Sequence, residues 1–181
     1  MPLTPSVQPA LPGLETTPAL NDSGADISAC GRYRYSLWRR WGPGPSVLFV
    51  GLNPSTADAT LDDPTIRRCI GFARAWGYGG LVMANLFAWR DTAPAGMMAA
   101  ADPVGPDNDR VLQAEHVRAA LTVAAWGAHG AHLGRDEVVR ALLPRLHCLR
   151  LTKHGHPGHP LYLPASLQPV PWLVPDPEGG T

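Results

Sequence analysis

The stretch Val-Leu-Phe-Val-Gly-Leu-Asn-Pro, at residues 47–54, decides the fold. Its four leading residues form a continuous apolar run, which is typical of a strand buried on both faces of a parallel sheet. A loop must follow this strand, because Pro54 keeps the preceding residue, Asn53, out of helical geometry. Further along, the acidic pair at residues 62–63 precedes Pro64, the pattern of an N-cap followed by proline at the first helical position. The sequence therefore predicts a strand, a loop and a helix in that order.

The same alternation of strand and helix continues along the chain. Short apolar runs predict further buried strands, and apolar residues at a spacing of three and four predict helices. We expect strands at residues 81–87, 121–126 and 146–151, and helices at residues 64–76, 108–120 and 136–146. Strands separated by helices of roughly a dozen residues indicate an α/β protein with a parallel sheet. We therefore predict a three-layer α/β/α sandwich with a mainly parallel central sheet.

Residues 32–41 alternate bulky apolar side chains with arginines. Tyr33, Tyr35 and Leu37 would face one side and the arginines the other, which predicts a half-exposed strand at a sheet edge. In such a strand the arginines either contact phosphates or are solvated and protect the edge against pairing with another chain.

Both ends of the chain are rich in proline and small residues. Such a composition buries too little apolar surface to offset the entropy cost of ordering. We predict a disordered tail over residues 1–27, a single α/β domain over residues 28–165 and a second proline-rich tail over residues 166–181.

Composition narrows the class of protein further. Of the 181 residues 45% are hydrophobic, but no apolar run approaches the roughly 20 residues of a membrane-spanning helix. Fifteen basic and fifteen acidic residues cancel, which argues against a strongly basic nucleic-acid binder. The three cysteines form neither a disulfide framework nor a Cys-x-x-Cys motif, and the sequence has no secretory signal. We expect a cytoplasmic protein that contacts no membrane and contains no metal or other cofactor.

Polar side chains follow the predicted strands at their carboxyl ends. Asn53 follows the first buried strand and Asn85 lies in the second, while residues 126–129 and 154–159 follow the third and fourth. Ligands of open α/β sheets bind beyond the carboxyl ends of the strands. The topology therefore predicts that these four groups converge on one site.

Four short motifs occur in the order found in a known group of enzymes. They are Gly-Leu-Asn-Pro at 51–54, Ala-Asn-Leu-Phe at 84–87, Ala-Trp-Gly-Ala-His at 125–129 and His-Pro at 159–160. In this order they resemble the motifs of the uracil-DNA glycosylase superfamily, which implies a uracil-DNA glycosylase-like fold. The full run, from Gly-Leu-Asn-Pro-Ser-Thr-Ala-Asp through Asp-Asp-Pro-Thr to His-Pro-Leu-Tyr-Leu, is also similar to a bacterial and phage family of unknown function over about residues 30–164.

The resemblance to the glycosylases implies roles for individual residues. Asn53 would orient the attacking water, Asn85 would read the edge of the base, and His159 would support negative charge on a base carbonyl oxygen. The other implied contacts are Gly51, Leu52, Pro54, Ser55 and Phe87 in the base pocket, and Pro160, Leu161 and Tyr162 at the DNA, with Leu161 or Tyr162 as the wedge. Phe87, Trp89 and Tyr162 are the candidates for stacking on the base. Ser55 departs from the Gly or Tyr of many members, the usual Ser-Pro does not follow His-Pro, and three cysteines cannot hold an iron–sulfur cluster.

The chemistry of glycosidic cleavage suits these residue types. Breaking an N-glycosidic bond develops positive charge on the sugar and negative charge on the base. The Asn53 amide can hold a water but is a weak base, so donors at the leaving oxygen, such as His159, would supply most of the acceleration. Losing one such donor typically costs about 3 to 4 kcal/mol. Asn85 offers a donor and an acceptor, the pair that reads O4 and N3–H of uracil.

We therefore predict a monomeric, metal-independent DNA glycosylase of base excision repair. It would flip uracil or another deaminated or modified pyrimidine out of DNA and hydrolyse its glycosidic bond. One alternative is a protein of the same fold that binds a base, nucleotide or nucleic acid without cleaving it. Another is an enzyme that acts on free nucleotides.

Simpler structural roles remain open for the same residues. Residues 53–56 suit a turn whose side chains bond the local backbone, and Asn85 could satisfy buried backbone groups. Trp126 and Gly127 could pack in the core, and His129 could lie on the surface.

The acidic and histidine-rich segments also allow more than one interpretation. Asp58, Asp62 and Asp63 could supply a carboxylate pair for acid–base or magnesium chemistry, but capping of the next helix explains Asp63 more simply. A zinc site could form from the late histidines, which are His147, His154, His156 and His159. No cysteine or carboxylate completes a recognisable zinc set, however.

Overall fold

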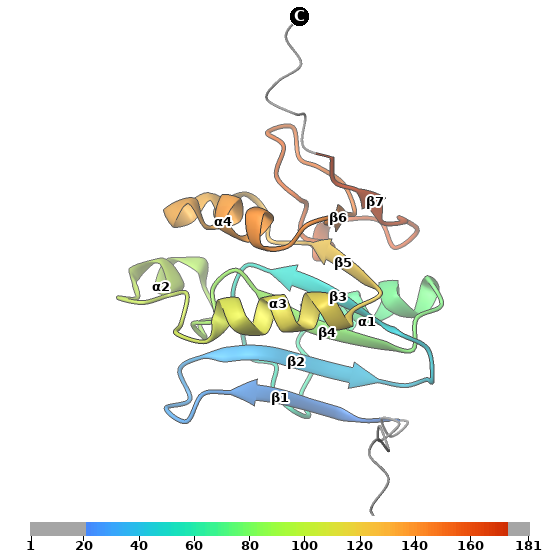
Figure 1. Cartoon of the computed structure of the whole chain (residues 1–181), viewed down its shortest axis with the longest axis horizontal. Coiled ribbons are helices and arrows are strands. Elements are labelled where there is room, and N and C mark those ends of the chain that lie inside the picture. Colours follow the sequence, from blue (N-terminus) through green and yellow to red (C-terminus); the bar gives the residue numbers. More distant parts are fainter. Residues whose placement is uncertain (1–20, 174–181) are drawn as a thin grey trace, which may run out of the picture.

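The structure is a computed structural model of the chain, and it describes residues 21–173. These residues form an α/β fold with one mixed sheet and helices over both of its faces (Figure 1). The strands are β1 (Ser23–Ile27), β2 (Arg34–Arg40), β3 (Ser46–Gly51), β4 (Gly80–Asn85), β5 (Leu121–Ala124), β6 (His147–Cys148) and β7 (Val170–Pro171). The helices are α1 (Pro64–Ala75), α2 (Pro94–Ala99), α3 (Asn108–Arg118) and α4 (Arg135–Leu142), with 3₁₀ segments η1 (Ala128–Gly134) and η2 (Pro160–Tyr162).

Within the described residues the sheet has seven strands, in the order β1-β2-β4-β3-β5-β6-β7. The pairs β4–β3, β3–β5 and β5–β6 are parallel, and the pairs β1–β2, β2–β4 and β6–β7 are antiparallel. The prediction of a mainly parallel sheet therefore holds only for the four neighbouring strands β4, β3, β5 and β6. A short turn joins β1 to β2, and such a connection allows only antiparallel pairing.

β3 lies at the centre of the molecule, as its apolar sequence requires. Leu48, Phe49 and Val50 are fully buried. Because successive side chains of a strand point to opposite faces, Phe49 packs against α1 while Leu48 and Val50 pack on the face that α2, α3 and α4 cover (Figure 1). Both faces of the strand are thus in the core, which explains why its apolar run is continuous rather than alternating.

Both ends of the sheet lie beyond the domain boundaries that composition predicts. Residues 23–27, assigned above to the N-terminal tail, form β1, and residues 170–171, assigned to the C-terminal tail, form β7. Backbone hydrogen bonds to a neighbouring strand hold these segments, and composition does not reveal such bonds. Residues 1–20 and 174–181 of the two predicted tails lie outside the described residues.

β2 is an interior strand rather than the predicted half-exposed edge. β1 pairs along its outer side and β4 along its inner side. Arg34 and Arg39 are buried together with Leu37, so the arginines do not form a solvated face. The prediction was wrong because the strand that covers this edge comes from a segment without an apolar pattern.

A bulge in β2 determines where its first arginine points. Asp26 pairs with Ser36, but the next residue of β1 pairs with Arg34, which leaves Tyr35 as an extra residue in β2. An extra residue of this kind re-aims the side chains beyond it. Arg34 consequently lies on the same side of the sheet as Arg39, and both bind the loop that precedes α1.

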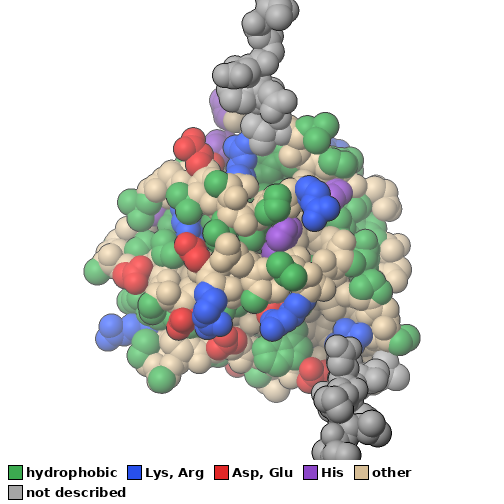
Figure 2. Space-filling view, in the orientation of Figure 1, with side chains coloured by type: hydrophobic (Ala, Val, Ile, Leu, Met, Phe, Trp, Pro, Cys, Tyr) green, Lys and Arg blue, Asp and Glu red, His purple; other side chains and the backbone are tan. Residues whose placement is uncertain are grey.

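The apolar length of the helices and the distribution of surface charge indicate which kinds of partner the protein could bind. None of the helices in residues 21–173 is long and apolar enough to cross a lipid bilayer. On the face shown in Figure 2, acidic and basic side chains are interspersed rather than gathered into one field, in keeping with a net charge of zero. Any binding of phosphates on this face would therefore depend on individual side chains.

Candidate functional site

A cavity of about 600 Å³ lies where β3, β4 and β5 end. Small-molecule sites usually occupy roughly 300–1,000 Å³, so the cavity could hold a nucleobase with its sugar. Its walls come from the loop after β3, the end of β4, the segment after β5 and the 3₁₀ turn η2. Nine of the residues to which the glycosylase resemblance assigns a role line it: Gly51, Leu52, Asn53, Ser55, Asn85, His159, Pro160, Leu161 and Tyr162.

The amide nitrogen of Asn53, a residue of the cavity wall, is already bonded to the backbone. Its Nδ2 donates hydrogen bonds to the carbonyl oxygens of Asp91, at 2.9 Å, and Pro54, at 3.2 Å. These two bonds fix the plane of the amide and leave Oδ1 as the acceptor available to a water or a ligand. The turn-forming role and the water-orienting role are therefore compatible in one side chain.

Asn85 is only 2% exposed, lines the cavity, and has no hydrogen-bond partner for its Nδ2 in the part of the chain that the structure describes. A role in satisfying buried backbone groups is wrong for this residue, because Asn108 does that work. The Nδ2 of Asn108 donates to the backbone carbonyls of Asn85, at 3.0 Å, and Leu86, at 2.9 Å. Leaving a buried amide group unpaired costs about 1–3 kcal/mol. A ligand that accepts a hydrogen bond from Asn85 would recover that energy.

His159 is held as a neutral ring with a defined proton position. Its Nδ1 accepts a hydrogen bond from the backbone N–H of Leu161 at 3.2 Å, so the proton of the neutral ring is on Nε2. Burial lowers the pKa of His159 below its ordinary value of 6.5, although the Asp63 carboxylate opposes this effect. At neutral pH the side chain therefore offers an Nε2–H donor without a positive charge.

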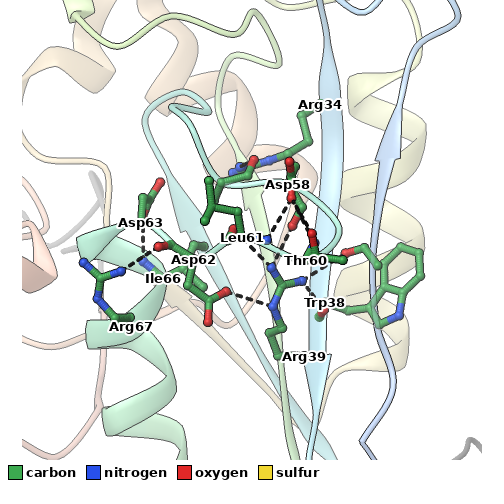
Figure 3. Close-up of polar contacts among 12 residues, drawn as sticks. Arg34, Trp38, Arg39, Asp58, Thr60, Leu61, Asp62, Asp63, Ile66 and Arg67 are labelled. Carbon is green, nitrogen blue, oxygen red and sulfur yellow. Dashed lines mark hydrogen bonds and ion pairs between the residues drawn. The ribbon is translucent and has the colours of Figure 1, made fainter.

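Two buried arginines of β2 fix the loop that leads into α1 and forms part of the cavity wall (Figure 3). Arg34 donates from Nη1 to the carbonyl oxygen of Ala57 at 2.7 Å. Arg39 donates from Nη2 to the carbonyl oxygen of Asp58 at 2.7 Å, and from Nε to the Asp62 carboxylate at 2.8 Å. Arg34 itself lines the cavity. The two buried arginines of β2 thus hold a loop of the cavity wall in place. They do not form an exposed phosphate-binding strand.

The acidic residues of this loop act mainly on the backbone. Asp63 caps α1 by accepting a hydrogen bond from the N–H of Ile66 at 2.9 Å, which confirms the predicted N-cap. Asp58 accepts from the N–H groups of Thr60 and Leu61, and these bonds lower the pKa of its carboxyl. Of Asp58, Asp62 and Asp63, only Asp63 lines the cavity, so the three do not form an acidic pair there.

Two predicted pocket residues do not line the cavity. Phe87 is fully buried in the core beneath α2 and α4, where its ring lies 5.6 Å from that of His132. Its expected contact with a base is therefore wrong. Pro54 is buried and uses its carbonyl oxygen to accept from the Asp91 N–H. Of the three aromatic residues considered for stacking, Tyr162 alone lines the cavity.

The remaining candidates divide between packing and the cavity. Trp126 is 1% exposed and packs in the core, as the simpler structural role predicts, although it also borders the cavity. His129 is exposed at the rim. Within residues 21–173 no three His, Cys, Asp or Glu side chains are grouped closely enough to hold a metal ion, so a zinc site at the late histidines has no support.

Sequence reasoning missed five polar residues of the cavity: Arg34, Thr65, Asp91, Thr92 and Thr152. The bulge that turns Arg34 towards the cavity cannot be recognised from the alternation of apolar and polar residues in the sequence. Asp91 follows the end of β4, the place where a ligand site is expected, and its carbonyl oxygen fixes Asn53. Position relative to the strand end could have identified Asp91, but not Arg34.

Together these features define an α/β protein with a cavity of about 600 Å³, lined in part by polar side chains, at the carboxyl ends of β3, β4 and β5. The chain belongs to the family described as protein of unknown function (DUF1643), whose model matches residues 34–161. The matched segment runs from β2 into η2 and contains every cavity residue except Tyr162. Searches of curated proteins and of solved structures returned no match.

Proposed function

We propose that this protein is a DNA glycosylase that removes uracil or another deaminated or modified pyrimidine from DNA. The observation that carries the proposal is that Asn53, Asn85 and His159, from three distant segments, line one cavity. A three-layer α/β/α arrangement and the order of the four motifs support a relation to the uracil-DNA glycosylase superfamily. The target nucleotide would leave the duplex and enter the cavity, as it must for an enzyme that acts on a base.

The polar groups suit the two charges that develop as the glycosidic bond breaks. The Oδ1 of Asn53 would hold the water that adds to the sugar, because its Nδ2 is already bonded to the backbone. The Nε2–H of His159 would donate to a carbonyl oxygen of the departing base, because its Nδ1 is already occupied. Preorganised donors of this kind contribute most of the rate enhancement in many enzymes.

Two further features suit a base extracted from DNA. Asn85 would pair with the edge of the pyrimidine, since its buried Nδ2 lacks a partner in residues 21–173. Tyr162 is 84% exposed and lies beside His159, with ring centroids 5.5 Å apart. An exposed aromatic at the rim could take the space that the flipped base leaves in the stack.

The test is the formation of abasic sites. Full-length protein is incubated with single- and double-stranded oligonucleotides that contain one uracil, and alkaline cleavage measures the product. We expect cleavage by the wild type, and a loss of about 100-fold or more in N53A and in H159Q. H156Q is the matched control, because His156 lies in the same loop but does not line the cavity. No product with any of these substrates, or equal product from all variants, would overturn the proposal.

A second candidate function is binding without cleavage. It is favoured because residue 53 carries an amide, which is a weak base, and because the one carboxylate of the loop that lines the cavity, Asp63, is bonded as the cap of α1. Retention of uracil-containing DNA without abasic product would select this function. Turnover of free nucleotides in place of DNA would instead select the nucleotide-acting enzyme.

A further inference from the structure

Arg34 is a buried cation in the wall of the cavity, and its hydrogen-bonding capacity is only partly used. The residue is 2% exposed. Its Nη1 donates to the carbonyl oxygen of Ala57, but its Nε is buried without a partner in the described residues. The guanidinium of this cavity residue thus has hydrogen-bonding capacity that the described residues do not use.

Other buried arginines of the described chain have carboxylate partners. Arg39 pairs with Asp62 and Arg135 pairs with Asp109, whereas Arg34 forms no ion pair within residues 21–173. A buried charge without a partner destabilises the folded state, because the charge has lost its hydration. Arg34 is thus a buried cation at the cavity without an ion-pair partner in residues 21–173, and this position favours an anionic ligand.

We propose that Arg34 stabilises the negative charge of a pyrimidine base held in the cavity, an inference that rests on the proposed function. When the glycosidic bond breaks, its electron pair moves onto the base and is shared between N1 and the carbonyl oxygens. The water oxygen forms the new bond to the sugar and releases its proton to solvent. Arg34 contributes charge and donors but transfers no proton.

The protonation state of Arg34 agrees with this role. Burial lowers the pKa of its guanidinium to about 10, and the Asp63 carboxylate acts in the opposite direction. The group is therefore still cationic at neutral pH. Its positive charge complements His159, which supplies a donor but no charge.

A purely structural role for Arg34 would be to hold the loop before α1, and Arg39 provides the matched control. Arg39 is also buried in β2 and also binds this loop, through Asp58 and Asp62, but it does not line the cavity. R34Q and R39Q each remove one anchor of the loop. Only R34Q removes a charge from the cavity.

The first experiment measures binding of free bases to the full-length protein by calorimetry. The probes are uracil, which is neutral at neutral pH, and 5-nitrouracil, which is anionic there. We expect the wild type and R39Q to bind the anion more tightly, and R34Q to lose at least about tenfold of that preference. R34K, which keeps the positive charge, should retain part of the preference for the anionic base. A wild type that binds both bases equally would overturn the proposal without any variant.

The second experiment measures single-turnover excision of uracil and of 5-fluorouracil from the same oligonucleotide. 5-Fluorouracil leaves more readily as an anion and needs less help. We expect R34Q to slow uracil excision about 100-fold and to slow 5-fluorouracil excision less, so that the ratio of the two rates rises. R39Q should leave that ratio at its wild-type value. Equal ratios in R34Q and R39Q would show that Arg34 acts only on the loop.

The two experiments separate this inference from the proposed function. If no oligonucleotide is cleaved but the preference for the anionic base depends on Arg34, the glycosylase proposal fails and the anion site stands. The opposite outcome is excision of uracil with no change in R34Q, either in the preference for the anionic base or in the ratio of the two excision rates. The glycosylase proposal then stands and the role of Arg34 is refuted.

Discussion

Gly51 sets the space available to the buried amide in the cavity. A Cβ at this position would lie 2.8 Å from the Oδ1 of Asn85, closer than side chains tolerate. Asn85 is short and buried, so it has little room to retreat. We expect G51A to lower the free energy of unfolding by about 1–3 kcal/mol and to abolish uracil binding, measured by urea denaturation and calorimetry.

Gly71 offers a matched control for this substitution. It lies on the exposed side of α1, and an added Cβ there would meet nothing within 4 Å. G71A should therefore stabilise the protein by up to about 1 kcal/mol, because alanine favours helix, and should leave binding unchanged. If G51A binds uracil as tightly as G71A does, Asn85 does not contact the base.

His159 makes the stability of the protein dependent on pH. Burial lowers its pKa in the folded state below 6.5, so the unfolded chain takes up a proton more readily. The stabilising contribution is then complete above about pH 6.5 and is lost as the pH falls through the folded-state pKa. We expect the thermal midpoint of the wild type to fall more steeply with acid than that of H159Q, by calorimetry from pH 7.5 to pH 5.

H156Q is again the matched control for His159, because it removes a histidine of the same loop that does not line the cavity. Protonation of Nδ1 would also break the bond from the Leu161 N–H, which caps η2. Equal slopes for the wild type and H159Q would show that the ring is not held in its neutral form.

At the scale of elements, α1 depends on one side chain that serves two purposes. Asp63 caps the helix through the N–H of Ile66 and raises the pKa of His159. D63A should lower the free energy of unfolding by about 1 kcal/mol, whereas D63N should retain most of it because asparagine caps as well as aspartate. Urea denaturation measures both changes.

The two roles of Asp63 can be separated by pH. D63N removes the carboxylate that favours the protonated ring, so the acid-induced loss of stability due to His159 should move to lower pH. NMR titration of the histidine ring would detect the shift. An unchanged titration in D63N would mean that the Asp63 charge does not reach His159.

Elements with local signals could be predicted from the sequence. The apolar run before Gly51 identifies β3, and the Asp-Pro pair before Thr65 identifies α1. Both signals consist of residues that are adjacent in the sequence, so they can be recognised without knowing the fold. β1 could not be predicted in the same way. Its residues carry no apolar pattern, and pairing with β2 orders them.

The same distinction applies to the candidate site. Asn53, Asn85 and His159 follow strands or precede a 3₁₀ turn, and the carboxyl ends of inner strands meet, so their convergence could be expected. Arg34 could not be found because a bulge re-aims it. Phe87 was misplaced because the chain, two residues beyond β4, turns into the core.

At the scale of the whole molecule, α1 connects the two halves of the cavity wall. Its N-terminus is fixed to the loop held by the arginines of β2. On the same helix, Arg68 donates to the carbonyl oxygens of Pro160 and Leu163, and Trp76 donates to that of Leu167 at 3.0 Å. The order of the late loop around His159 therefore depends on packing of α1 against the sheet, and through β2 on the edge strand β1.

Removal of β1 is the test of that dependence. A chain that begins at residue 28 lacks the strand, whereas a chain that begins at residue 21 keeps it. Each lost backbone hydrogen bond contributes about 0.5–1.5 kcal/mol, so we expect the shorter chain to lose on the order of 3 kcal/mol of unfolding free energy and to aggregate through the bared edge of β2. In the full chain G24A should act in the same direction, because its Cβ would overlap the ring of Trp38. Equal urea midpoints and equal uracil binding for the two shortened chains would show that β1 does not support the cavity.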